Sequence, residues 1–245
     1  MKDTSLLKKA ITSVMAGLIV AVVLLLLGNS GTISWFPPPV VFSLVGLALL
    51  LSIVFPFIWQ YKEKRNRWNT AKIYTWLYNL IRNGVAFNLM SFAWKKFFGL
   101  QFNTQAHTSD LPFSQQTGEM LTWNYFSYSH TFSLIVACLQ LAGAIMLLFR
   151  RTLLLGSAIV FSLMLNITLI NICYHLNLGA LLQSVVATLA TVFILLLHYE
   201  RLLVFFINPQ PDVFPATQVN NRTKYLVRFS VIALALLFTY CLTLE

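Results

Sequence analysis

Seven apolar runs, each long enough to cross a lipid bilayer, constrain this chain more than any other feature. A transmembrane helix needs about 20 predominantly apolar residues to cross a hydrocarbon core of about 30 Å. The chain meets that requirement over 11–28, 40–60, 72–94, 127–149, 153–174, 180–198 and 226–244. We therefore predict an all-α fold, a polytopic transmembrane bundle of about seven helices that contacts the lipid bilayer.

The composition agrees with a membrane bundle. Of the 245 residues, 58% are hydrophobic and only 10% are charged, which is more apolar surface than one soluble core can bury. The net charge of +10 does not indicate nucleic-acid binding, because the basic residues form short clusters between the apolar runs and act there as topology signals. No A-x-A-type cleavage site follows the first run, so we expect a retained helix.

The basic residues also predict the orientation of the helices. A cytoplasmic N-terminus places 14 of the 17 lysines and arginines on the cytoplasmic side, as the positive-inside rule favours. The C-terminus is then external, and so are Lys95, Lys96 and the loop over 97–123. At about 27 residues this loop exceeds the usual connection, which indicates a structured cap or a functional loop.

A change in composition near residue 70 predicts three parts. Residues 1–70 form a transmembrane hairpin that is more purely aliphatic than the middle segments, and we expect it at the periphery. Residues 71–200 form a bundle with polar seams and the external loop 97–123. Residues 201–245 form a cytoplasmic loop and a C-terminal transmembrane helix.

Arg82 is a guanidinium inside an apolar run, and charges in such positions are functional-site candidates because burying them unpaired in hydrocarbon is costly. Asn79 and Asn83 flank it and offer amide oxygens. Lys96 follows 14 residues later, so both cations lie on one helix face about 21 Å apart. Arg82 is interpreted either as a structural clamp that binds backbone carbonyls of a neighbouring helix or as a ligand contact.

Three later runs carry small and polar residues at helical spacing that could converge on Arg82. Such faces either line a pocket or form hydrogen bonds between helices, which are worth about 0.6 kcal/mol each in membrane bundles. Both interpretations stay open. The resulting candidate residues for a polar, ligand-binding or structural seam are Arg82, Asn79, Asn83, Lys96, His130, Gln140, Asn171, His175 and Gln183.

Chemistry beyond binding has weaker support in the sequence. His130 and His175 are both predicted near the external end and could bind a metal or shuttle protons, but no third ligand accompanies them. We favour interfacial capping and predict no metal site. The three cysteines form no CxxC pair, the transmembrane runs hold no carboxylate for a proton-coupled transporter, and no nucleophile motif identifies a catalytic residue.

The order of these residues resembles the DoxX-like family of integral membrane proteins. Arg82, the small residue Ala93 and Lys96 are similar to the family's first-helix pattern of an arginine, an AG-type pair and a lysine. The stretch 140–156, QLAGAIMLLFRRTLLLG, is similar to its second-helix pattern. The resemblance covers about residues 72–200. This chain departs from the family pattern at two positions. It has Ala93 where the family has a glycine, and Gln140 where the family often has a glutamate. The second difference removes a titratable partner for Arg82.

The resemblance implies a four-helix core in a bacterial cytoplasmic (inner) membrane. It also implies a quinone as a possible cofactor, since some members are thought to be small subunits of complexes that pass electrons to quinone. We expect an accessory or partner-binding subunit, whose partner is another membrane or periplasmic protein. Its outward-facing polar pocket would bind a small or lipid-like ligand. The alternatives are a quinone-linked oxidoreductase component, which would be an enzyme, and a small-solute transporter.

Overall fold

The computed structural model describes residues 5–28, 36–65, 67–101, 111–206 and 220–242. It divides into two compact units, Met1–Leu202 and Leu203–Glu245, and the described residues contain helices but no strands. In chain order the elements are α1 (Leu6–Leu27), α2 (Pro38–Lys64), α3 (Thr70–Phe97), the short 3-10 helix η2 (Phe113–Gln115), α4 (Gly118–Tyr128), α5 (His130–Leu148), α6 (Leu153–Cys173), α7 (Leu178–Leu197), α8 (Tyr199–Phe206) and α9 (Asn221–Leu242).

Five of these helices, α1, α2, α5, α6 and α7, are long and apolar enough to cross a membrane. The chain is therefore an all-α, multi-pass membrane protein, as predicted. The runs predicted over 72–94 and 226–244 do form helices, but α3 and the described part of α9 are not among those five. The hydropathy of α3 is lowered by its polar residues, which include Asn79, Arg82, Asn83 and Asn88.

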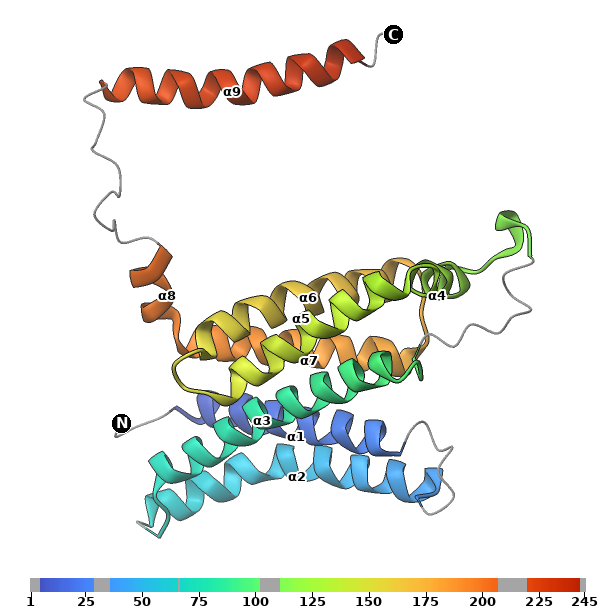
Figure 1. Ribbon diagram of the computed structural model, residues 1–245. Coiled ribbons are helices and arrows are strands. Elements are labelled where there is room, and N and C mark those ends of the chain that lie inside the picture. Colours follow the sequence, from blue (N-terminus) through green and yellow to red (C-terminus); the bar gives the residue numbers. More distant parts are fainter. Residues whose placement is uncertain (1–4, 29–35, 66, 102–110, 207–219, 243–245) are drawn as a thin grey trace. The chain divides into compact units, whose positions relative to one another are not determined.

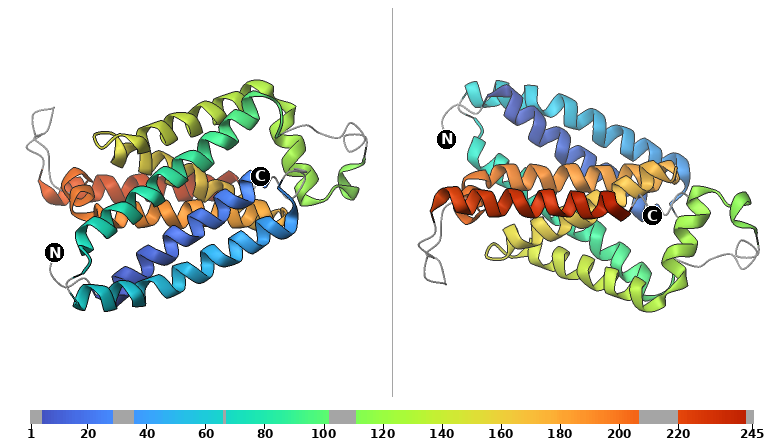
Figure 2. Two further views of the ribbon diagram at one scale, coloured as in Figure 1. Left: turned by 90° about the horizontal axis from the view of Figure 1, so that it is seen from below. Right: turned by 90° about the horizontal axis from the view of Figure 1, so that it is seen from above.

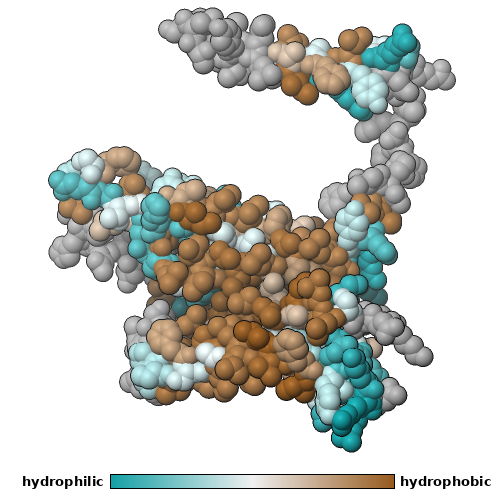
Figure 3. Space-filling view, turned by 180° about the vertical axis from the view of Figure 1, so that it is seen from behind, coloured by the Kyte–Doolittle hydropathy of each residue, from teal (hydrophilic) through white to brown (hydrophobic). Residues whose placement is uncertain are grey.

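The surface of the first unit matches a lipid environment. Large apolar side chains are exposed along α2, and more than half of the surface of each of Phe42, Leu50, Ile53 and Phe57 is accessible. Figure 3 shows that hydrophobic residues cover the middle of the bundle while hydrophilic residues gather toward its ends. In water such a surface would drive association, so lipid is its natural solvent.

The core of the first unit lies between α1, α3, α5, α6 and α7. Helix α3 packs against α1, α5 and α7, and α6 packs between α5 and α7 (Figures 1 and 2). Helix α2 packs on the outer side of α1. Because Ala16, Ile19 and Val22 belong to the same buried cluster as Val85 and Leu89, α1 belongs to the bundle core, whereas the sequence predicted a peripheral hairpin.

The bundle has two chemically different ends. Helices α2, α5 and α7 end at the same side at which α1, α3 and α6 begin (Figure 1). This side, the basic end, carries Lys8, Lys9, Lys62, Lys64, Arg65, Arg67, Lys72, Arg150, Arg151 and Arg201. The opposite side, the α4 end, carries α4 together with Lys95 and Lys96. The basic end is the side that the positive-inside rule predicts to be cytoplasmic.

The residues predicted as the loop 97–123 and the helix 127–149 form different elements in the structure. Helix α3 continues to Phe97, Gly118–Tyr128 forms α4, and α5 begins only at His130. The predicted run 127–149 is interrupted because the Ser129 backbone is extended and its hydroxyl accepts a hydrogen bond from Phe132 N at 3.2 Å. This is the geometry of a helix N-cap, which starts a new helix and ends the previous one.

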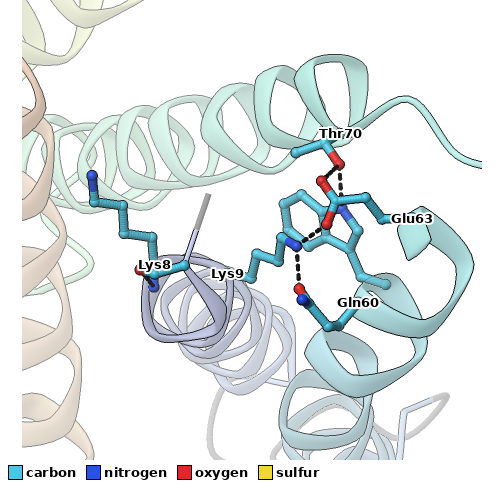
Figure 4. Close-up of polar contacts among 7 residues, drawn as sticks. Lys8, Lys9, Gln60, Glu63 and Thr70 are labelled. Atoms are coloured by element: carbon cyan, nitrogen blue, oxygen red, sulfur yellow. Dashed lines mark hydrogen bonds and ion pairs between the residues drawn. The ribbon is translucent and has the colours of Figure 1, made fainter. Parts of the chain in front are cut away.

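A buried charge joins α1 to α2 and to the start of α3 at the basic end. The Lys9 ammonium is fully buried and donates hydrogen bonds to Gln60 and to Glu63. Thr70 in turn donates to Glu63 and accepts from Trp59 Nε1 at 3.3 Å. Figure 4 shows Lys9 pointing into this cluster and Lys8 pointing away from it. Sequence analysis interpreted both lysines as topology signals and missed the structural role of Lys9.

Candidate functional site

A cavity of about 100 Å³ lies inside the bundle near the α4 end. One water needs roughly 10–15 Å³ of such space, so the cavity has room for several non-hydrogen atoms of a ligand. Apolar side chains such as Leu89, Phe92, Met164, Ile167 and Ile170 form most of its wall. Its polar lining residues are Asn88, Lys96, Gln101, Thr122, Gln140, Asn171, Gln183 and Ser184.

The strongest polar feature of the wall is the contact between Lys96 of α3 and Gln140 of α5. Lys96 Nζ donates a hydrogen bond to Gln140 Oε1 at 2.8 Å, and the two residues are only 5% and 2% exposed. Lys96 lies on the face of α3 that also carries the buried Leu89 and Ala93, so the helix directs its side chain inward. A buried ammonium requires such hydrogen bonds, because its desolvation is otherwise costly.

Further hydrogen bonds hold the other helices around the cavity. Asn171 of α6 donates from Nδ2 to Ala180 O at 3.0 Å and to Ser184 Oγ at 2.8 Å on α7. Asn88 Nδ2 donates to Gln183 Oε1 at 3.5 Å, the outer limit of a hydrogen bond. These bonds link α3, α6 and α7, so several of the polar residues have a structural role as well as a place in the wall.

The cavity brings together four of the nine sequence-predicted residues, Lys96, Gln140, Asn171 and Gln183. It also includes Asn88, Gln101 and Thr122, which the sequence analysis did not assign to the seam. Asn88 could have been found from its spacing, since it lies eight residues before Lys96 and therefore on the same face of α3. Gln101 and Thr122 lie outside the apolar runs, where helical spacing carries no information.

The remaining five predicted residues lie elsewhere. Asn79 is half-buried and Asn83, His130 and His175 are exposed, and none of them lines the cavity. The parts of the chain that the structure describes hold no group of three histidine, cysteine or acidic side chains that could bind a metal.

Arg82 is separated from the cavity and faces the basic end. Its guanidinium carbon is 6.0 Å from the centre of the Tyr78 ring, which lies one turn toward the start of α3. The predicted seam from Arg82 to Lys96 is therefore divided between two sites. In the DoxX-like resemblance, Gln140 takes the position of a glutamate that could pair with Arg82. In the structure, Gln140 contacts Lys96 instead.

The arrangement suits the binding of an amphipathic molecule. An ammonium group has three donors and no acceptor, so Lys96 favours ligand groups that accept hydrogen bonds, such as a carbonyl, carboxylate or phosphate oxygen. The apolar wall favours a hydrocarbon or ring portion. A quinone head group, with two carbonyl oxygens on an apolar ring, fits this donor set, and Lys96, Asn88 and Gln183 would be the side chains to hold it.

Comparisons with known proteins show a similarity over part of the chain. The chain is 29% identical over 94 residues to the uncharacterized protein YwoB of Bacillus subtilis (strain 168). The match covers 38% of this chain and 58% of that relative. No protein-family model matches the chain, and no solved structure matches it.

Proposed function

We propose that this protein is an accessory subunit of a bacterial cytoplasmic membrane that binds a small lipid-like molecule in the cavity at the α4 end. The ligand is a molecule with a hydrogen-bond-accepting head group, which contacts Lys96, and an apolar portion, which contacts the walls. One observation carries this proposal. A buried cation, held by Gln140 at 2.8 Å, lies in the wall of a cavity that is otherwise mostly apolar.

The size and position of the cavity narrow the ligand class. About 100 Å³ accepts a head group or one ring, and a longer chain would have to continue outside the cavity. Exposed apolar side chains surround the bundle, so an acyl or isoprenoid chain would find lipid there. A quinone, which the DoxX-like resemblance implies, and a fatty acid are both consistent with these requirements.

The ligand can be tested with the full-length protein purified in mild detergent. Organic extracts of the wild type, Lys96→Met and Gln140→Leu would be compared by mass spectrometry, with Lys95→Met as the matched control. Lys95 is the neighbouring lysine, and it does not line the cavity. A short-chain quinone and oleic acid, added separately, would serve as carbonyl and carboxylate probes.

We expect the wild type and Lys95→Met to retain a lipid-like molecule or one of the probes. Lys96→Met and Gln140→Leu should lose it while keeping a cooperative unfolding transition. Equal retention by all four proteins, or retention by none of them, would refute binding in this cavity. Reduction of the quinone probe with an added electron donor would instead support the oxidoreductase alternative.

A further inference from the structure

Three arginines from separate elements act electrostatically on Tyr78 at the basic end. Arg82 comes from α3, Arg150 from the turn between α5 and α6, and Arg201 from α8. The Arg82 guanidinium lies 6.0 Å from the ring centre. The charges of Arg82, Arg201 and Arg150 all act on the Tyr78 hydroxyl, so three positive charges lie within electrostatic range of one side chain.

A hydrogen bond connects two of the three elements that carry these charges. Tyr78 Oη and His198 Nε2 are hydrogen-bonded at 3.0 Å, and their rings meet edge to face. Arg201 N donates to His198 O at 3.0 Å, which anchors the start of α8 at the same place. The Tyr78 contact therefore holds α3, which carries Arg82, against the α7–α8 junction, which carries Arg201.

One arginine has an unsatisfied donor. The Nε atom of Arg82 is buried and has no hydrogen-bond partner among the described residues. None of the three arginines forms an ion pair with a carboxylate among the described residues. A guanidinium presents planar donors that match the oxygens of a phosphate.

We propose that Arg82, Arg150 and Arg201 form a binding site for a phosphate group, supplied by the head group of an anionic phospholipid. Arg150 and Arg201 are exposed while Arg82 is partly buried, so the phosphate would lie at the surface and Arg82 would reach it from below. The lipid source is favoured because Trp76, Leu196 and Leu80 are exposed nearby on α3 and α7, where acyl chains would pack. Basic pockets between transmembrane helices on the cytoplasmic side commonly bind such head groups.

The site is tested by native mass spectrometry and thermal unfolding of the full-length protein. The probes are dioleoyl phosphatidylglycerol, the zwitterionic dioleoyl phosphatidylcholine and inorganic phosphate. The deciding variant is Arg150→Gln/Arg201→Gln, because both side chains are exposed and their loss should leave the fold intact; Arg82→Gln is a second variant. The matched control is Arg65→Gln, since Arg65 is also exposed and lies 4.3 Å from the Tyr61 ring.

We expect phosphatidylglycerol to bind the wild type and Arg65→Gln and to raise their unfolding temperature. The double variant should bind it at least about tenfold more weakly, the loss expected from removing one strong charge-assisted contact. Equal binding by the double variant, or equal binding of phosphatidylcholine, would overturn the proposal. Protection by inorganic phosphate without any by phosphatidylglycerol would overturn the lipid source. These outcomes do not depend on whether the cavity at the α4 end binds a ligand.

Discussion

The Lys9 ammonium of α1 and the Glu63 carboxylate of α2 form an ion pair in which Lys9 is fully buried and Glu63 is 26% exposed. Replacing Lys9 by Met should therefore lower the free energy of unfolding by about 2 kcal/mol, less than the ~3–5 kcal/mol typical of a fully buried pair. Thermal or denaturant unfolding in detergent would measure the loss. Lys8→Met is the control, because Lys8 is exposed on the same turn. Equal stability of the two variants would contradict this role of Lys9.

The crossing of α5 and α6 depends on Gly156. A Cβ at this position would lie 2.7 Å from Met146 Cβ and 3.0 Å from Gly143 O, so the backbones are too close for a larger residue. We expect Gly156→Val to destabilise the protein by about 1–3 kcal/mol, the usual range for overpacking. Gly46→Ala is the control, because nothing lies within 4 Å of a Cβ there. A stable Gly156→Val protein would show that the helices can separate without loss.

Asn171 should contribute to stability apart from any ligand. Its replacement by Leu removes the hydrogen bonds to Ala180 O and Ser184 Oγ, and each such bond between membrane helices is worth about 0.6 kcal/mol. We expect a loss of about 1 kcal/mol in unfolding measurements on ligand-free protein. Asn166→Leu, on the exposed face of the same helix, should stay within about 0.5 kcal/mol of the wild type. Equal effects at the two positions would argue against the assigned bonds.

Stability should decrease in mild acid because of His198. Burial, with a further contribution from the charge of Arg201, holds the pKa of His198 below its ordinary value of 6.5. The unfolded chain then binds more protons than the folded protein below about pH 6.5. The contribution of His198 to the free energy of unfolding is therefore fully present above about pH 6.5. It is lost as the pH falls toward the pKa that His198 has in the folded protein. Unfolding temperatures at pH 7.5 and 5.5 would show a smaller decrease for His198→Gln than for the wild type; identical decreases would exclude His198 as a cause.

The predicted orientation can be measured with membrane-impermeant maleimide in a variant without its native cysteines. A cysteine in place of Ser114, which is exposed in η2, should react in intact cells because the α4 end is predicted to be external. A cysteine in place of Lys64, exposed at the end of α2, should react only after lysis. The reverse pattern would invert the topology and would place the cavity at the cytoplasmic side.

The apolar runs predicted the helices with good accuracy because a membrane requires a minimum length of apolar sequence and permits few alternatives. The run 153–174 became Leu153–Cys173 and the run 180–198 became Leu178–Leu197. The break at Ser129 was missed, because a serine cap inside apolar and aromatic sequence changes the hydropathy very little. The long polar loop likewise concealed α4, whose first turn is set by the Thr117 cap.

The sequence by itself determined the class of protein, the five described helices that are long and apolar enough to cross a membrane, and the identity of the polar residues that lie on helix faces. It did not determine their partners, because helical spacing states which face of one helix a residue occupies but not how far neighbouring helices are shifted or rotated. Tertiary structure paired Lys96 with Gln140 and buried Lys9 against Glu63, whereas the contact of Arg82 with Tyr78 follows from their spacing of four residues on α3. The Lys96–Gln140 and Lys9–Glu63 contacts each join two helices, and only the packing of the bundle brings these residues within reach.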